Sequence, residues 1–131
     1  MKIKLVSIPV SDQEAALNFY EGILGFVKKH DIPLGGGNRW LTLVSKDEPD
    51  GTELLLEPAP LHFEPSKVYQ KALYDAGMPC GQFDVEDLDA EYERLVAKGV
   101  SFSMTPTDVG TAKVAIFDDT CGNRVQLVQV L

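Results

Sequence analysis

The sequence has few of the features that mark a disulfide framework, a zinc site or a membrane span. Only two cysteines are present, Cys80 and Cys121, and neither lies at the spacing of a Cys or Cys/His metal motif. We therefore expect two reduced thiols. No apolar run approaches the roughly 20 residues of a membrane-spanning helix, and the opening MKIK lacks the layout of a signal peptide. These absences predict a cytoplasmic protein without a membrane partner.

Positive charge is also scarce. Lys and Arg total 12 against 20 Asp and Glu, so the formal net charge is −8, and the acidic residues are spread along the chain. Nucleic acids and anionic membrane surfaces attract basic patches, so we expect neither of them as a partner. The excess of acid mildly favours a neutral or cationic ligand.

A repeated pattern runs through the 131 residues, a length that suffices for one domain with a sizeable core. The segment VSDQEAALNFYEGILGF at 10–26 returns as VEDLDAEYERLVAKGVSF at 85–102, so that Asp12 corresponds to Asp87. In each copy alternating apolar residues precede the Asp, and apolar residues at helical spacing follow it. We expect each Asp to cap a helix rather than to act in catalysis, because its carboxylate can accept the free N–H groups of a first turn.

The periodicity predicts the same order of elements twice: a strand, a helix and three strands joined by short turns. In the first unit we expect strands over 2–10, 26–32, 38–45 and 52–57 and a helix over 12–24. In the second we expect strands over 80–85, 100–104, 112–118 and 124–130 and a helix over 87–98. Turns are expected over 33–37 and through Pro106 to Gly110, and a short helix over 66–76.

This order predicts an α+β fold, because antiparallel strands with short turns need a helix to cover one face. We expect two curved four-stranded sheets in one domain. Unit one covers 1–58, a proline-rich connection covers 59–79, and unit two covers 80–131.

Three motifs carry a resemblance to a known family. Val-Ser-Asp at 10–12 and the run from Ala-Leu-Asn-Phe-Tyr to Ile-Leu-Gly-Phe at 16–26 open the first unit, and Asp-Asp-Thr-Cys-Gly-Asn-Arg-Val-Gln-Leu at 118–127 closes the second. With the duplicated βαβββ order, they resemble the vicinal oxygen chelate superfamily of glyoxalase I, extradiol dioxygenases, and fosfomycin- and bleomycin-resistance proteins. The resemblance covers essentially the whole chain. It implies a cup-shaped sheet with half from each unit, helices outside the cup, and a homodimer.

The resemblance also indicates where metal-dependent members hold a divalent ion with four side chains. These positions correspond here to Leu5, Leu55, Cys80 and Gln126. Leucine offers no lone pair, a neutral amide is a weak ligand, and a single thiolate lacks the partners of a zinc site. We therefore expect no metal cofactor.

The match of the first unit to the family pattern depends on where a gap is placed. If that placement moves by one or two residues, Glu57 comes toward the metal site. Neither His30 nor His62 lies at a ligand position, and we expect both to be exposed or hydrogen-bonded.

Strand alternation predicts which side chains line the cup. A ligand pocket needs an apolar wall and a few polar anchors, and the expected interior supplies both. The candidate pocket residues are Ser7, Trp40, Glu57, Cys80, Gln82, Asp84, Lys113, Phe117 and Gln126. The opposite faces, with residues such as Val114 and Ile116, are more apolar and are expected to form the core beneath the helices.

Alternatives remain for individual pocket residues. Lys113 could form an ion pair with Glu57 or Asp84 instead of contacting a ligand. Cys80 could act as a nucleophile only if a neighbouring cation lowered its pKa, and Lys113 is the candidate for that role.

Three functional hypotheses follow. The first is a metal-independent protein that sequesters a small organic molecule in the cup. The second is a lyase, isomerase or dioxygenase of the same superfamily that uses Glu57 or Asp84 as a general base, with or without a weakly held metal. Glu57 pointing into the cup beside Gln126 would favour this enzyme. The third is a protein-interaction module whose cup is filled by large side chains.

Overall fold

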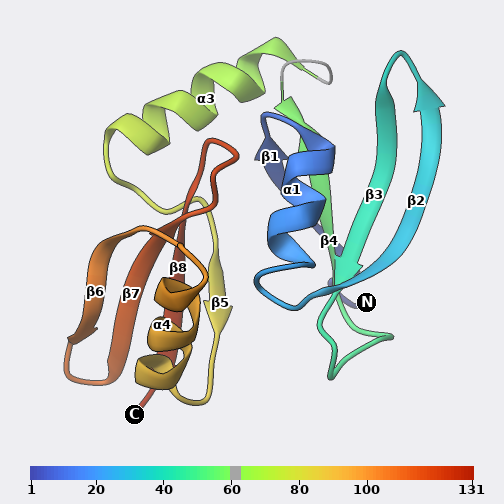
Figure 1. The fold of residues 1–131 in the computed structure, drawn as a ribbon. Coiled ribbons are helices and arrows are strands. Elements are labelled where there is room, and N and C mark those ends of the chain that lie inside the picture. Colours follow the sequence, from blue (N-terminus) through green and yellow to red (C-terminus); the bar gives the residue numbers. More distant parts are fainter. Residues whose placement is uncertain (60–62) are drawn as a thin grey trace. The chain divides into compact units, whose positions relative to one another are not determined.

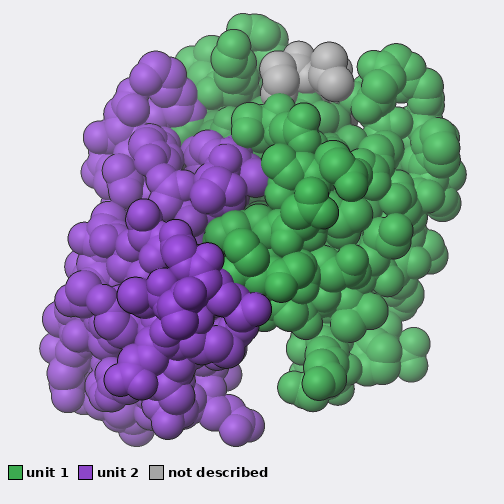
Figure 2. Space-filling view, viewed as in Figure 1, with its two compact units in different colours: residues 1–70 green, residues 71–131 purple. Residues whose placement is uncertain are grey.

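The computed structural model describes residues 1–59 and 63–131, which form two compact units, 1–70 and 71–131 (Figure 2). His62, which we expected to be exposed or hydrogen-bonded, lies outside the described residues. The boundary between the units falls inside helix α3, Glu64–Asp75, so the expected connection is divided between them. That the two units belong to one domain stays a prediction.

Unit 1 contains a four-stranded sheet with one helix packed on one face (Figure 1). Its elements are β1 Leu5–Val10, α1 Gln13–Tyr20, β2 Val27–Gly35, β3 Asn38–Val44 and β4 Glu53–Pro58. The strand order is β1-β4-β3-β2, with β1 and β4 parallel and the other neighbours antiparallel.

Unit 2 repeats this arrangement, with the order β5-β8-β7-β6 and a parallel pair formed by β5 and β8. Its elements are β5 Gln82–Asp84, α4 Leu88–Ala97, β6 Phe102–Asp108, β7 Ala112–Asp118 and β8 Arg124–Val130. The α+β class and the duplicated βαβββ order are therefore confirmed. None of the described helices has both the length and the apolar composition that a membrane crossing requires.

Both helices begin as the sequence predicts. The Asp12 carboxylate accepts the Ala15 N–H at 2.7 Å, and the Asp87 carboxylate accepts the Ala90 N–H at 3.1 Å. The first helix is shorter than expected, because it closes after Tyr20 in a turn that ends at Gly25, whose φ of +92° suits a residue without Cβ.

Two expected turns are partly strand. β2 continues through Pro33 to Gly35, and β6 continues through Pro106 to Asp108. Both are edge strands, and both prolines lie at or beside shifts in the pairing register. An edge strand tolerates proline because the missing N–H faces no second partner.

Candidate functional site

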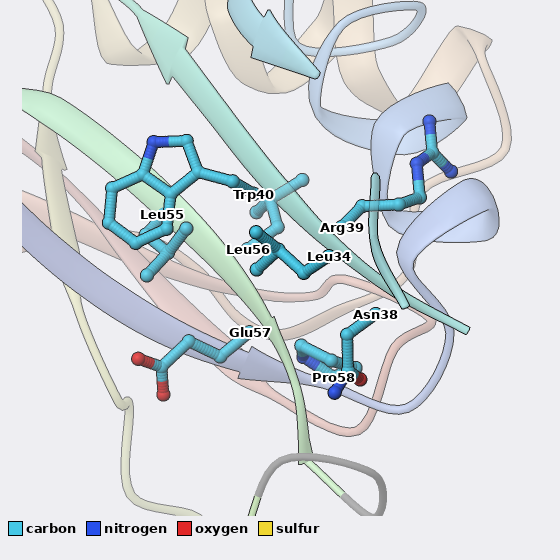
Figure 3. A pocket seen from close by; sticks show the side chains of 8 residues that line it. All are labelled: Leu34, Asn38, Arg39, Trp40, Leu55, Leu56, Glu57 and Pro58. Carbon is cyan, nitrogen blue, oxygen red and sulfur yellow. The ribbon is translucent and has the colours of Figure 1, made fainter. Parts of the chain in front are cut away.

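The candidate site is a cavity of about 140 Å³ in unit 1, between the ends of β3 and β4, which we call the Trp40 cavity (Figure 3). Its wall is mainly apolar and comes from Leu34, Trp40, Leu55, Leu56 and Pro58. Asn38, Arg39 and Glu57 complete the lining. A dry cavity of about 150 Å³ can hold a benzene ring, so this one has room for a single aromatic ring.

The Trp40 cavity lies where β3 and β4 separate. These strands pair only at residues 42–43 and 54–55. Beyond that point the Gln13 side chain of α1 occupies the gap: Nε2 donates to the Arg39 carbonyl at 2.8 Å and to the Leu56 carbonyl at 2.7 Å, and Oε1 accepts the Arg39 N–H at 3.0 Å. A side-chain amide thus replaces ladder hydrogen bonds between the strands.

Trp40 and Glu57 project to the same side of the sheet, with the indole over Leu55 and the carboxylate beyond it (Figure 3). The strand register explains this, because residues 40, 55 and 57 lie on the face that the 42–55 pair defines. Both side chains are half-buried. Within the described part of the chain, nothing donates a hydrogen bond to the Glu57 carboxylate.

Asn38 also lines the cavity, and its side chain carries an unsatisfied acceptor. Its Oδ1 atom is buried and has no hydrogen-bond partner among the described residues. A buried oxygen without a donor is costly, because it has lost its hydration and gained nothing in return. The same burial closes Oδ1 off from the cavity, so the atom offers no acceptor to a ligand there.

The positive charge of Arg39 is not available to a ligand in the Trp40 cavity. Its guanidinium points toward α1 (Figure 3), donates to both Asp31 oxygens at 2.9 and 2.7 Å, and donates to Glu14 at 2.6 Å. The hydrogen bonds from Arg39 lower the pKa of Asp31 to about 2. The cavity is therefore left with the negative charge of the Glu57 carboxylate, an arrangement that favours a cation.

A polar cluster on the same face of unit 1 was not singled out from the sequence. Glu53 is buried, accepts the Thr42 hydroxyl at 2.8 Å and the Lys4 ammonium at 2.9 Å, and lies 3.6 Å from His30 Nε2. The hydrogen bond from Lys4, followed by that from Thr42, lowers the pKa of Glu53. Alternation along β2, where His30 pairs with Thr42, was the signal that could have found it.

The other predicted residue of unit 1, Ser7, pairs with Leu55 in the β1–β4 register and is exposed. It shares the face of Trp40 and Glu57 but does not line the Trp40 cavity. Of the predicted residues in this unit, the structure therefore brings Trp40 and Glu57 together and leaves Ser7 apart.

In unit 2, three predicted residues share one face of the sheet. Gln82 pairs with Gln126 in the parallel β5–β8 register, and Asp84 pairs with Val128. The two amides are joined, because Gln126 Nε2 donates to Gln82 Oε1 at 2.6 Å.

Two predicted pocket residues, Lys113 and Phe117, lie on the opposite face, so their assignment was wrong. Phe117 pairs with Val125 and is fully buried beside Phe102, whereas Gln126 pairs with Ile116. Lys113, on the same side of β7 as Phe117, donates to Asp89 of α4 at 2.6 Å. The β7–β8 turn sets this register, and strand alternation alone does not predict it.

Cys80 does not have the surroundings of a nucleophile. Burial, together with the negative charge of Asp119, raises the pKa of its thiol to about 12. The ammonium of Lys113, the cation expected to activate it, is paired with Asp89. The thiol is therefore protonated at neutral pH, and the hypothesis that Lys113 activates it is wrong.

The four positions that correspond to a family metal site do not fit a divalent ion. Leu5 and Leu55 carry no donor atom, the Cys80 thiol is held protonated, and the Gln126 amide is already bonded to Gln82. Across the described residues, no group of three or more His, Cys, Asp or Glu is arranged to hold a metal.

Comparison with known proteins identifies a family model and a related protein that match nearly the whole chain. A model described as the glyoxalase/bleomycin resistance protein/dioxygenase superfamily matches residues 2–127. The chain is 52% identical over 129 residues to the uncharacterized protein YurT of Bacillus subtilis, covering 98% of this chain and 99% of that one.

Two solved structures are similar over nearly their whole length. UcmS2 has 34% identity and a TM-score of 0.81, with 98% of this chain and 97% of that chain covered. TnmS3, described as an antibiotic binding protein from Streptomyces sp. CB03234, has 31% identity and a TM-score of 0.77, with 100% and 97% covered.

Proposed function

The chain belongs to the glyoxalase/bleomycin resistance protein/dioxygenase superfamily, and from this premise we propose that it binds a small organic molecule. The Trp40 cavity receives an aromatic part of that molecule and an ammonium group attached to it. The observation that carries the proposal is the pairing of an apolar, aromatic wall with the Glu57 carboxylate, without an unpaired cation among the described residues that line the cavity.

Each part of the cavity suits one part of such a ligand. The Trp40 indole can stack on an aromatic ring or lie against a cation, since its face carries partial negative charge. Glu57 attracts the positive charge and accepts its N–H groups. The net charge of −8 favours the approach of a cation.

The size of the cavity supports the proposal that the protein holds only part of a larger ligand in it. About 140 Å³ is less than the ~300–1,000 Å³ of sites that enclose drug-sized ligands. A relative described as an antibiotic binding protein supports a ligand of that larger class. We further propose that binding requires no metal, because the donor set at the family positions is unsuited to one.

A matched set of single-ring probes tests the proposal by calorimetric titration. Benzylamine is an ammonium with N–H donors, benzyltrimethylammonium is a cation without donors, benzyl alcohol is neutral, and benzoate is an anion. We expect benzylamine to bind most tightly, the two intermediate probes more weakly, and benzoate not at all. Equal affinity for benzylamine and benzoate would contradict the proposal.

Variants assign this preference to residues. Trp40→Leu keeps an apolar wall but removes the ring, and we expect it to weaken benzylamine binding roughly three- to tenfold. Glu57→Gln should weaken benzylamine by about tenfold and leave benzyl alcohol unchanged. Glu48→Gln, an exposed residue of the 45–52 turn, makes the same change in net charge and should have no effect.

The position of Glu57 in the cavity lining also favours a second function, that of a lyase, isomerase or dioxygenase in which Glu57 is the general base. If the protein converts a ligand, Glu57→Gln should abolish turnover while neutral probes still bind. Turnover that survives this substitution would remove Glu57 as the base.

A further inference from the structure

We infer that Gln13 is the positioning residue of the Trp40 cavity: its side-chain amide holds β3 and β4 apart and so creates the space into which a ligand ring enters. The consequence for binding rests on the proposed function. The structural part, that Gln13 keeps the strands separated, does not depend on any ligand.

The Gln13 side chain lies between β3 and β4, where it is hydrogen-bonded to both strands. Gln13 is the first residue of α1, only 6% exposed, and its amide serves three backbone groups of Arg39 and Leu56. If the register of the 42–55 pair continued, Arg39 would lie opposite Pro58. Pro58 has no N–H, so the ladder could not be completed there, and the Gln13 amide provides the alternative partners.

The second unit provides an internal comparison. Leu88 follows the capping Asp87 as Gln13 follows Asp12, and it is likewise the first residue of its helix. Leu88 is fully buried, and it offers the backbone no amide. Beside it β7 and β8 pair without a break, from Ala112 with Val130 to Asp118 with Arg124.

The two units therefore share their order of elements and their helix cap. They differ in the first residue of the helix, and they also differ in how far the neighbouring strands pair. Where the first helical residue is Gln13, the equivalent strands pair at two positions and a cavity opens between their ends. Where it is Leu88, they pair at seven positions. Because an apolar side chain cannot satisfy backbone groups, the strands must satisfy one another.

Gln13→Leu tests the structural part without a ligand. We expect the strands to approach each other at Trp40 and Glu57, although Pro58 still cannot donate to the ladder, and NMR should then show an Hα–Hα contact between these two residues that the wild-type protein lacks. Gln70→Leu is the matched control, because Gln70 is a buried glutamine of unit 1 whose amide donates to the Pro9 carbonyl of β1. It should leave the strands apart.

The same variants test the effect on binding. Benzylamine affinity should fall by at least about tenfold in Gln13→Leu and stay within about twofold of wild type in Gln70→Leu. If wild type binds benzylamine and Gln13→Leu binds it equally, with no new contact between Trp40 and Glu57, the inference is wrong. If wild type binds no probe while Gln13→Leu still closes the strands, the proposed function fails and the structural part stands.

Gln13→Glu keeps the inference testable even if Gln13→Leu does not fold. It preserves the size of the side chain and its acceptor for the Arg39 N–H, but the carboxylate cannot donate to the two carbonyls. Protonation restores one donor. Burial beside two carbonyl oxygens should raise the pKa of the new carboxyl above its ordinary value. The affinity relative to wild type at the same pH should therefore be low near neutrality and recover as the pH falls toward about 5. A ratio that does not change with pH would contradict the role of the amide donors.

Discussion

Glu53 is the buried carboxylate of unit 1 whose ionisation is coupled to folding. Lys4 and Thr42 lower its pKa below the ordinary 4.5. Because the pKa in the folded state lies below that in the unfolded state, the stabilisation is complete above the unfolded pKa and is lost as the pH falls through the folded pKa.

We expect Glu53→Gln to reduce the free energy of unfolding by about 1–2 kcal/mol at neutral pH, because it removes charge-assisted hydrogen bonds. The difference between variant and wild type should narrow below about pH 4. Urea unfolding at both pH values measures it, with Glu48→Gln as the exposed control. An equal loss at both pH values would show that the charge of Glu53 is not the cause.

Cys80 gives a second prediction for a single side chain. With its pKa raised to about 12, the thiol should react slowly with iodoacetamide at pH 8 while the protein is folded. Cys121 is fully buried and should behave likewise. Both thiols should react quickly in urea. Rapid labelling of native protein that disappears in Cys80→Ser would contradict the protected thiol.

Among the candidate site residues of unit 1, alternation along the strands correctly predicted that Trp40 and Glu57 share a face of the sheet. Trp40 and Glu57 share a face because they lie on strands whose register follows from the hydrophobic pattern. Lys113 and Phe117 were assigned to the wrong face, because one step of register across the 119–123 turn exchanges the two faces of β7.

At the scale of elements, the two helix caps are equivalent and can be compared directly. Asp12→Ala and Asp87→Ala should each lower the free energy of unfolding by about 1 kcal/mol, because each carboxylate satisfies a first-turn N–H. Asp→Asn at either position should cost less, since the amide oxygen still accepts. Urea unfolding checks both pairs, and no loss in either Ala variant would show that the caps are not stabilising.

The order of elements was predictable because strand and helix periods and the capping residues are local signals. The strands over 112–118 and 124–130 were predicted with the bounds that the structure has. The ends of β2 and β6 were not, because Pro33 and Pro106 indicate a turn unless the strand is known to be at an edge. Edge position is a property of the whole sheet.

At the scale of the whole molecule, the separation of β3 and β4 was beyond local prediction. Gln13 reaches Arg39 and Leu56, which lie 26 and 43 residues away in the sequence. No periodicity relates these positions, and Gln13 reads as an ordinary residue of a first helical turn. Comparison of the two repeats, glutamine against leucine after the same capping Asp, was the one signal that could have drawn attention to it.

The oligomeric state is a further property of the whole molecule, and the homodimer that the family resemblance implies stays a prediction. The edge strand β2 exposes apolar side chains, with Ile32 51% and Leu34 62% accessible, and exposed edges of this kind invite pairing. Sedimentation equilibrium should give twice the chain mass of 14.4 kDa. A mass of one chain at micromolar concentration would contradict the dimer, and an Ile32→Lys variant should weaken it.

The most direct test of the central claim uses the one tryptophan of the chain, whose indole N–H gives a single NMR signal. During titration with benzylamine, we expect this signal to shift and saturate, with backbone shifts concentrated at Leu34, residues 38–40 and residues 55–58, the lining of the Trp40 cavity. Benzoate should leave the signal in place. An indole signal unmoved by benzylamine, or saturable shifts confined to other residues, would contradict the assignment of the ligand site to this cavity.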